Sequence, residues 1–146
     1  MISFRPATRE NVNLLIGLAG GTGSGKTFTG MRLATGMSGG KRFAVIDTEN
    51  GRASHYADQY QFDVAELHAP FSPSAYTDAI LAADAAGYPV IMVDSMSHEY
   101  AGEGGVRHLV RDDVAVEAHP PTQLIQVRLA VGDPAAEIAG PGLGVP

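Results

Sequence analysis

The sequence predicts an α/β protein with a parallel, doubly wound sheet, and three observations support this prediction. Short apolar runs typical of buried strands alternate along the chain with segments of helical spacing. Two of these runs end in a carboxylate, at Asp47 and at Asp94. An earlier run, Leu14–Ala19, leads into the glycine-rich octet 20–27. Because ligands bind such sheets at the carboxyl ends of the strands, we expect a site where these three runs end.

The first unit has the order strand, loop, helix. Leu14–Ala19 is a continuous apolar run, which predicts a strand covered on both faces. The octet that follows, Gly20-Gly21-Thr22-Gly23-Ser24-Gly25-Lys26-Thr27, matches the Walker A pattern G-x-x-x-x-G-K-[ST] in full. Apolar residues from Phe28 to Ala34 then recur at helical spacing, and Ser38-Gly39-Gly40 ends the helix. The alternative is a glycine-rich surface turn that matches by chance, but the order of these segments favours a phosphate-binding loop.

The residue types of the octet explain how it would bind a nucleotide. Glycines permit positive φ, so successive backbone N–H groups point at an anion, and the following helix adds the positive end of its dipole. Lys26 reaches the β- and γ-phosphates, and the Thr27 hydroxyl ligates Mg²⁺. The octet therefore predicts ATP and Mg²⁺ as cofactors. The expected nucleotide-binding residues here are Gly21, Thr22, Gly23, Ser24, Gly25, Lys26, Thr27 and Phe28.

Two weaker units follow the first helix. Arg42–Asp47 predicts a strand that turns abruptly from apolar to acidic, and the turn signal Asn50-Gly51 leads from it to a short helix over Ala53–Tyr60. A further strand is expected around Val64–His68, where Pro70 stops it. These segments continue the alternation that a parallel sheet with right-handed crossovers requires.

The next helix leads to the second acidic strand end. Ser72 as N-cap and Pro73 at the first helical position begin the helix, which ends at Gly87. Pro89–Asp94 then predicts a buried strand. Asp94 matches the Walker B motif, in which a strand-end carboxylate holds the Mg²⁺ that bridges the β- and γ-phosphates. The alternative is a structural cap, because many buried strands end in Asp.

The last third of the chain differs in composition. Residues 101–146 contain no aromatic residue and five of the nine prolines. Apolar residues from Val106 to Val114 predict a helix, Leu124–Leu129 predicts a strand, and the Gly, Pro and Ala from Gly132 onward predict disorder. We therefore divide the chain into a nucleotide-binding core, residues 1–105, and an atypical tail, residues 106–146. The tail is either flexible or a truncated or frame-shifted reading of a longer protein.

Composition excludes several classes of function. The 146 residues include no cysteine, so disulfides, thiolate metal sites and a cysteine nucleophile are excluded, and the five histidines lack metal-ligand spacing. The formal net charge of −6 argues against a protein that coats DNA by bulk electrostatics. The first residues lack the apolar region of a signal peptide, and no apolar run is long enough to cross a bilayer. We expect a cytoplasmic protein with no membrane partner.

A resemblance to a known family narrows the function. Ile46-Asp47-Thr48-Glu49-Asn50-Gly51, with Tyr56 seven residues past the glutamate and Val93-Asp94-Ser95 downstream, resembles the ATPase core of the RecA recombinases. More narrowly, it resembles the RecA-like "AAA family" ATPases of bacteriophages, which are linked to single-strand annealing and recombination. The resemblance covers about residues 12–105. It implies a three-layer P-loop NTPase fold with a mostly parallel sheet, which is incomplete at the C-terminus if the tail is foreign to the family.

The resemblance also implies roles for individual residues. Glu49 corresponds to the glutamate that polarises the attacking water, and Tyr56 to the tyrosine that stacks on adenine. Their alternatives are a helix N-terminal charge for Glu49 and, with Tyr60, one face of a core helix for Tyr56. Many ATPases place their water-activating glutamate directly after the Walker B carboxylate, but this chain has Ser95 there. Glu99 is therefore the reserve base, and the expected catalytic residues are Lys26, Glu49 and Asp94, with Thr27 and Asp94 as Mg²⁺ ligands.

Two residue sets remain open at this stage. A RecA-like core needs a further strand between the loop strand and the Walker B strand, with a polar sensor at its tip, and Gln123–Leu129 is the candidate, with Gln123 or Gln126 as sensor. Arg52 is either a phosphate contact, an arginine finger for a neighbouring subunit, or a solvated surface residue, and the last reading is favoured.

The function expected from the sequence is a Mg²⁺-dependent ATPase of the RecA-like class that acts in phage DNA recombination or repair, in the host cytoplasm. Single-stranded DNA and a homo-oligomer are the partners that the resemblance implies. The alternatives are a small-molecule (nucleotide) kinase and a catalytically inactive nucleotide-binding fragment. A kinase would need an arginine-bearing lid, for which Arg107 and Arg111 are the candidates.

Overall fold

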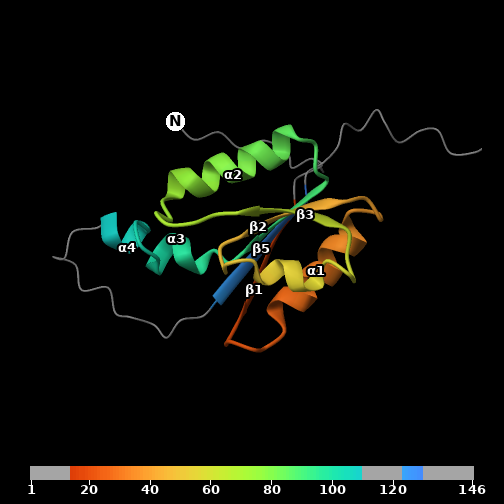
Figure 1. Cartoon of the computed structure of the whole chain (residues 1–146), viewed down its shortest axis with the longest axis horizontal. Helices are drawn as coiled ribbons and strands as arrows, with labels where there is room; N and C mark the ends of the chain where they lie inside the picture. The colour runs from red at the N-terminus through yellow and green to blue at the C-terminus, as the bar shows by residue number, and fades with distance from the viewer. Residues whose placement is uncertain (1–13, 110–122, 130–146) are drawn as a thin grey trace, which may run out of the picture.

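The computed structural model describes residues 14–109 and 123–129, which form a five-stranded sheet with helices on both faces (Figure 1). This confirms the predicted α/β class. Along the chain, the elements are β1 (Leu15–Gly20), α1 (Lys26–Met37), β2 (Phe43–Asp47), the 3₁₀ helix η1 (Arg52–Tyr56), β3 (Phe62–Glu66), α2 (Pro73–Ala85), β4 (Val90–Asp94), α3 (Ser97–Ala101), α4 (Val106–Leu109) and β5 (Gln123–Leu129).

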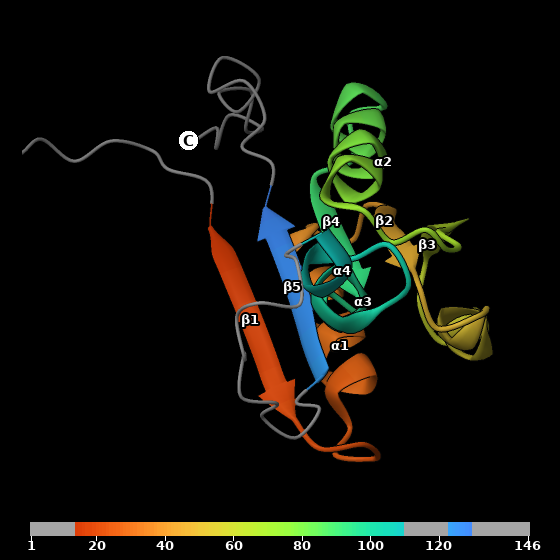
Figure 2. The ribbon, with the colours of Figure 1, turned by 90° about the vertical axis from the view of Figure 1, so that its left-hand side faces the viewer.

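The strand order is β1-β5-β4-β2-β3, so β5 lies between β1 and β4 (Figure 2). β2 pairs in parallel with β3 and with β4, as predicted. β5 pairs antiparallel with both β1 and β4, so the sheet is parallel except for this strand. Gln123 lies opposite Gly20 and Leu129 opposite Val90, so β5 begins at the edge of the sheet where β1 and β4 end. An antiparallel strand can start at that edge without the long crossover that a parallel neighbour needs.

The core lies on both faces of the sheet because β2 and β4 are buried along their whole length. Successive side chains of a strand point to opposite faces, so each strand supplies two layers. On one face, Val45 and Met92 pack with Met31 of α1. On the other face, Ile46 and Ile91 pack with Tyr76 of α2. Ile125 and Val127 of β5 are fully buried in the layer under α1, so residues after 105 share the core with the residues before them.

β1 departs from the prediction of a strand covered on both faces. Its residues alternate between exposed and half-buried, and Leu15 is 59% exposed. In the described part of the chain, β1 is an edge strand that pairs with β5 and packs against α1. An apolar run shows that a strand favours burial, but it does not show the position of that strand in the sheet.

The helix boundaries follow local signals. The Ser72 hydroxyl accepts a hydrogen bond from the N–H of Ala75 at 3.2 Å, which confirms the predicted N-cap of α2. Gly87 follows the helix with a φ of 79°, as a helix stop requires. Gly30 lets α1 approach β4 closely, because a Cβ at this position would lie 2.9 Å from Cε of Met92.

Three predicted elements differ in detail. The helix expected over Ala53–Tyr60 is instead the shorter 3₁₀ helix η1. β3 begins and ends two residues before the predicted range, because Phe62 at its start stacks on Phe43 with ring centroids 5.8 Å apart. The strand expected in the tail is present as β5.

Parts of the predicted tail lie outside the described residues. The helix expected over Val106–Val114 is described as far as Leu109, as α4. The segment from Gly132 onward is not described. Within the described ranges, no helix has both the length and the apolar character that crossing a membrane demands.

Candidate active site

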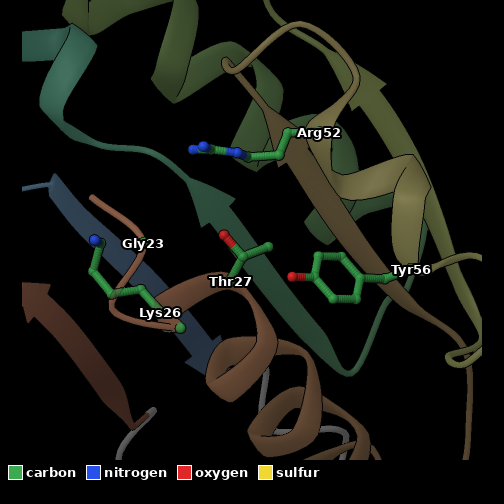
Figure 3. Close-up of a pocket in the computed structure, with 6 residues that line it drawn as sticks. Gly23, Lys26, Thr27, Arg52 and Tyr56 are labelled. Atoms are coloured by element: carbon green, nitrogen blue, oxygen red, sulfur yellow. The ribbon is translucent and has the colours of Figure 1, made fainter. Parts of the chain in front are cut away.

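A cavity of about 160 Å³ lies beyond the carboxyl end of the sheet, between the loop that joins β1 to α1 and the 3₁₀ helix η1 (Figure 3). The residues that line it are Gly23, Gly25, Lys26, Thr27, Arg52 and Tyr56. The sequence predicted five of these six residues as ligands of a nucleotide and favoured a surface location for Arg52. The two segments are 25 residues apart in sequence, counted from Thr27 to Arg52, and β2 brings them together.

The loop has the backbone that an anion site requires. Gly23 and Gly25 have φ values of 76° and 82°, which residues with a Cβ rarely adopt. Gly25 is also the N-cap of α1, where no side chain caps the helix, and the first helical bond runs from the N–H of Thr29 to the Gly25 carbonyl at 2.9 Å. The N–H groups before Thr29 therefore have no acceptor within the helix, and such groups bind phosphate at helix N-termini.

The Lys26 ammonium lies over this loop. Its Nζ donates to the Gly21 carbonyl at 2.6 Å and lies 3.4 Å from Oγ of Ser24, and the side chain is largely buried. An ammonium has three donors, so a phosphate can be bound while a contact with the loop is kept. Gly21, Thr22 and Ser24 belong to the same loop, but they do not line the cavity.

Thr27 and Asp94 meet directly. The Thr27 hydroxyl donates to Oδ2 of Asp94 at 2.7 Å, so the start of α1 is tied to the end of β4. Asp94 is 3% exposed, and burial raises the pKa of its carboxyl group. The bond from Thr27 lowers this pKa, whereas the charges of Glu49 and Asp47 raise it further and Arg52 lowers it.

This pair fits the expected Mg²⁺. Magnesium prefers oxygen ligands, and proteins usually supply one or two of them while phosphate and water supply the rest. A hydroxyl and a carboxylate 2.7 Å apart beside a phosphate loop match that donor set. In residues 14–109 and 123–129, no group of three or more His, Asp or Glu side chains is arranged to hold a metal.

Glu49 lies behind the cavity wall on the side of η1. Its Oε1 accepts a hydrogen bond from the Ser95 hydroxyl at 3.1 Å, and its Oε2 lies 3.7 Å from Nη1 of Arg52. Its charge acts on Asp94, as the pKa of that residue shows. Glu99 on α3 acts instead on Tyr76 of α2. Of the two predicted bases, Glu49 therefore has the closer electrostatic link to the Walker B carboxylate.

Asp47 has a structural role that the sequence analysis did not assign. Its buried carboxylate accepts hydrogen bonds from the N–H groups of Glu49 at 2.6 Å and Ala53 at 2.7 Å. These bonds fold the turn 48–53 back onto the end of β2 and so orient both Glu49 and η1. An Asp that ends a strand three residues before Asn-Gly is a signal for such a turn.

Thr48 and Ser95 join the ends of β2 and β4. The Thr48 hydroxyl accepts from the Ser95 N–H at 2.9 Å and donates to the Ser95 carbonyl at 3.1 Å. The Tyr76 hydroxyl donates to the same carbonyl at 2.9 Å, and Nδ1 of His98 lies 2.8 Å from the Thr48 hydroxyl. Ser95 is fully buried, and its three hydrogen bonds with Thr48 and Tyr76 hold its N–H and its carbonyl group in place. Its hydroxyl donates to Glu49.

Three aromatic side chains form a cluster that includes Tyr56, which lines the cavity, whereas the predicted ligand Phe28 is not part of the lining. The rings of Phe28 and Tyr56 are 6.4 Å apart, and Tyr60 lies at a similar distance from both. Phe28 is 41% exposed, and Arg32 lies 5.8 Å from its ring centroid. Tyr56 packs with Tyr60 against the core and also lines the cavity, so its adenine contact stays a prediction.

The two candidate sensors lie at different distances from the site along β5. Gln123 starts the strand and is paired with Gly20, the first residue of the octet. Gln126 is paired with Gly17 and Val93, inside the sheet. The backbone of Gln123 thus borders the site, although β5 runs opposite to the other strands.

Comparison with protein-family models, with curated proteins and with solved structures finds no match for this chain.

Proposed function

We propose that this chain binds ATP with Mg²⁺ in the cavity and hydrolyses its terminal phosphate, as a P-loop ATPase of the RecA-like class. The observation that carries the proposal is the hydrogen bond from Thr27 to Asp94 across the mouth of the loop. It joins the expected hydroxyl ligand to the expected carboxylate ligand. Glu49 lies on the same edge of the sheet, bonded to the residue that follows Asp94.

The loop would hold the phosphates. Backbone N–H groups at the start of α1 and the Lys26 ammonium face the space in which a triphosphate would lie. Thr27 and Asp94 would hold Mg²⁺, which when bound neutralises charge on the β- and γ-phosphates. Tyr56, which lines the cavity and lies 6.4 Å from the Phe28 ring, would offer an aromatic face to the adenine.

Glu49 would act on the attacking water. Its carboxylate accepts a proton from water as the water oxygen forms a bond to the γ-phosphorus. The bond from that phosphorus to the β–γ bridging oxygen breaks, and its electron pair leaves on ADP. The proton on Glu49 passes to the phosphate product or to solvent, which restores the carboxylate. The Ser95 hydroxyl holds one oxygen of Glu49 during this step.

Action in DNA recombination or repair, with single-stranded DNA as partner and a homo-oligomer as the active form, is the more specific part of the proposal. Its support is the resemblance of residues 46–51 and 93–95 to the phage ATPases. The position of β5 between β1 and β4 is also the position that a RecA-like core needs for its further strand.

The alternatives have less support. The cavity is lined by one arginine, Arg52, and the candidate lid residue Arg107 on α4 is not part of the lining. Arg111 lies outside the described residues. A tail foreign to the family would leave the sheet without its further strand, but β5 lies between β1 and β4 and buries Ile125 and Val127.

ATP turnover tests the proposal. We expect phosphate release that depends on Mg²⁺ and increases with single-stranded DNA. We expect no transfer of phosphate to nucleoside monophosphate acceptors. Lys26→Ala should abolish binding of Mg²⁺–ATP in calorimetry, whereas Lys41→Ala, an exposed lysine before β2, should bind as the wild type does. Phosphate transfer to an acceptor would instead identify a kinase. Binding without turnover would identify an inactive protein, and unchanged binding by Lys26→Ala would reject the loop assignment.

A further inference from the structure

Arg52 faces the phosphate loop from the opposite wall of the cavity. Figure 3 shows its side chain extended over the cavity from η1, with Thr27 below it and Lys26 to the left of Thr27. The Asp47 carboxylate holds the backbone of the next residue, Ala53, at 2.7 Å, so the first turn of η1 has a fixed place beside β2. The position of Arg52 is therefore set by the fold of the turn, while its side chain is 43% exposed and accessible to a ligand.

The negative charges near the cavity create a need for a second cation if a triphosphate is to bind there. The charges of Glu49 and Asp47 both act on the Asp94 carboxyl group at this edge of the sheet. The cations that line the cavity are Lys26 and Arg52. A triphosphate brings more negative charge into this acidic surrounding, so its entry requires positive charge beyond that of Lys26. Guanidinium groups bind phosphate oxygens in bidentate fashion and are suited to this task.

The present partner of Arg52 is weakly held. Nη1 lies 3.7 Å from Oε2 of Glu49, which is longer than a direct hydrogen bond. The Arg52 side chain is 43% exposed and makes no direct hydrogen bond to Glu49 at this distance, so a phosphate can compete with the carboxylate for it. The Ser95 hydroxyl binds the other oxygen, Oε1, so the departure of Arg52 leaves that bond in place.

We propose that Arg52 is a ligand of the γ-phosphate that moves from Glu49 to the nucleotide when ATP binds. The inference rests on the proposed ATPase function and adds a residue to it. ADP lacks that phosphate and leaves Arg52 beside Glu49. Arg52 therefore distinguishes ATP from ADP.

The test compares affinities for two nucleotides in the full chain. We expect Arg52→Gln to weaken binding of the non-hydrolysable analogue AMP-PNP, with Mg²⁺, by about tenfold or more, and to leave the ADP affinity within about twofold, because a charge-assisted contact to one phosphate is lost. Arg52→Lys should recover part of the AMP-PNP affinity. Turnover by Arg52→Gln should fall by at least about a hundredfold, as arginines that stabilise phosphoryl transfer are worth this or more.

The matched control is Arg32→Gln. Arg32 is an exposed arginine on α1 that contacts the Phe28 ring and does not line the cavity. Any effect of the Arg32 substitution through Phe28 applies equally to both nucleotides. The ratio of the two affinities should therefore stay at the wild-type value. Thermal melting of each variant checks that the fold is retained.

The outcomes separate the two proposals. A wild-type ratio of AMP-PNP to ADP affinity in Arg52→Gln overturns the role of Arg52 and leaves the ATPase proposal standing. Equal loss for both nucleotides also overturns it, because the contact would then not involve the γ-phosphate. A wild-type chain that binds neither nucleotide overturns the proposed function, and the inference falls with it.

Discussion

The Thr27 hydroxyl donates a 2.7 Å hydrogen bond to Asp94, a residue 67 positions further along the chain. This bond sets the relative positions of the phosphate loop and the end of β4. Because both oxygens lie in place before any ligand enters, an ion that needs both of them meets a preorganised pair.

Replacement of Asp94 by Asn should stabilise the fold and abolish Mg²⁺-dependent turnover. Burial raises the pKa of Asp94 in the native chain above the usual value of 3.8, which applies to the unfolded chain. At a pH between the unfolded and the native pKa, the native chain holds a proton that the unfolded chain has released. Native stability is therefore lost as pH rises through this window, and Asn removes the cost of the buried charge. We expect a higher melting temperature for Asp94→Asn at pH 7 and a smaller difference near pH 4.

The control for this prediction is Asp58→Asn, which alters an exposed carboxylate in the turn after η1. Its melting temperature should follow that of the wild type across the same pH range. A lower melting temperature for Asp94→Asn at pH 7 would contradict the prediction, because the charge of Asp94 would then contribute to the stability of the fold.

Glu49→Gln should keep nucleotide affinity and lower turnover by about 10²–10⁴-fold, the usual contribution of a positioned base. Glu99→Gln is the matched variant, since Glu99 was the other candidate and acts on Tyr76. Steady-state phosphate release and calorimetry on both variants decide between them. The assignment is reversed if Glu99→Gln loses turnover and Glu49→Gln does not.

Ser95→Ala should lower kcat by about tenfold or more while KM for ATP stays near the wild-type value. The variant removes the hydroxyl that donates to Glu49 at 3.1 Å, and misplacement of a base affects the reaction more than ground-state binding. Ser95→Thr keeps a hydroxyl and should recover part of the rate. Ser38→Ala removes a buried serine hydroxyl at the other end of α1 and should leave kcat unchanged. An unchanged kcat in Ser95→Ala would refute the positioning role.

Tyr76→Phe should lower the free energy of unfolding by about 1 kcal/mol, because a buried hydrogen bond to the Ser95 carbonyl is lost. Burial also raises the pKa of Tyr76 from 10.0 to about 12. Between these values the unfolded chain releases the phenolic proton and the native chain keeps it, so the wild type loses stability as pH rises through this range. Tyr76→Phe should lose less stability there.

Urea unfolding at pH 7 and at alkaline pH measures both effects. Tyr100→Phe alters an exposed tyrosine and serves as the control. Equal stability of Tyr76→Phe and wild type at pH 7 would show that the remaining bond from Thr48 satisfies the Ser95 carbonyl by itself.

The sequence predicts the parts of the fold that depend on neighbouring residues. The octet 20–27, the N-cap at Ser72 and the stop at Gly87 act through local backbone geometry, and each is where the sequence predicts it. The exposure of β1 and the direction of β5 depend on which strands become neighbours across the sheet. An apolar run carries little information on that choice, so the prediction for β1 was wrong.

The candidate site also contains residues that local motifs predict and residues whose place only the fold determines. Lys26, Thr27 and Asp94 belong to short motifs, and the fold brings the last two into contact. Arg52 lines the cavity because η1 is a 3₁₀ helix held by Asp47, and a helical pattern in the sequence does not reveal that geometry. The bond between Ser95 and Glu49 joins residues 46 positions apart, so no local pattern announces it.

The place of β5 has a consequence for the order in which the protein matures. β1 leads directly into the phosphate loop, yet its partner in the described sheet is β5, which is encoded after every other described element. On the ribosome, the nascent chain presents the loop about a hundred residues before that partner emerges. Nucleotide affinity should therefore appear late in translation, once Leu129 has left the exit tunnel.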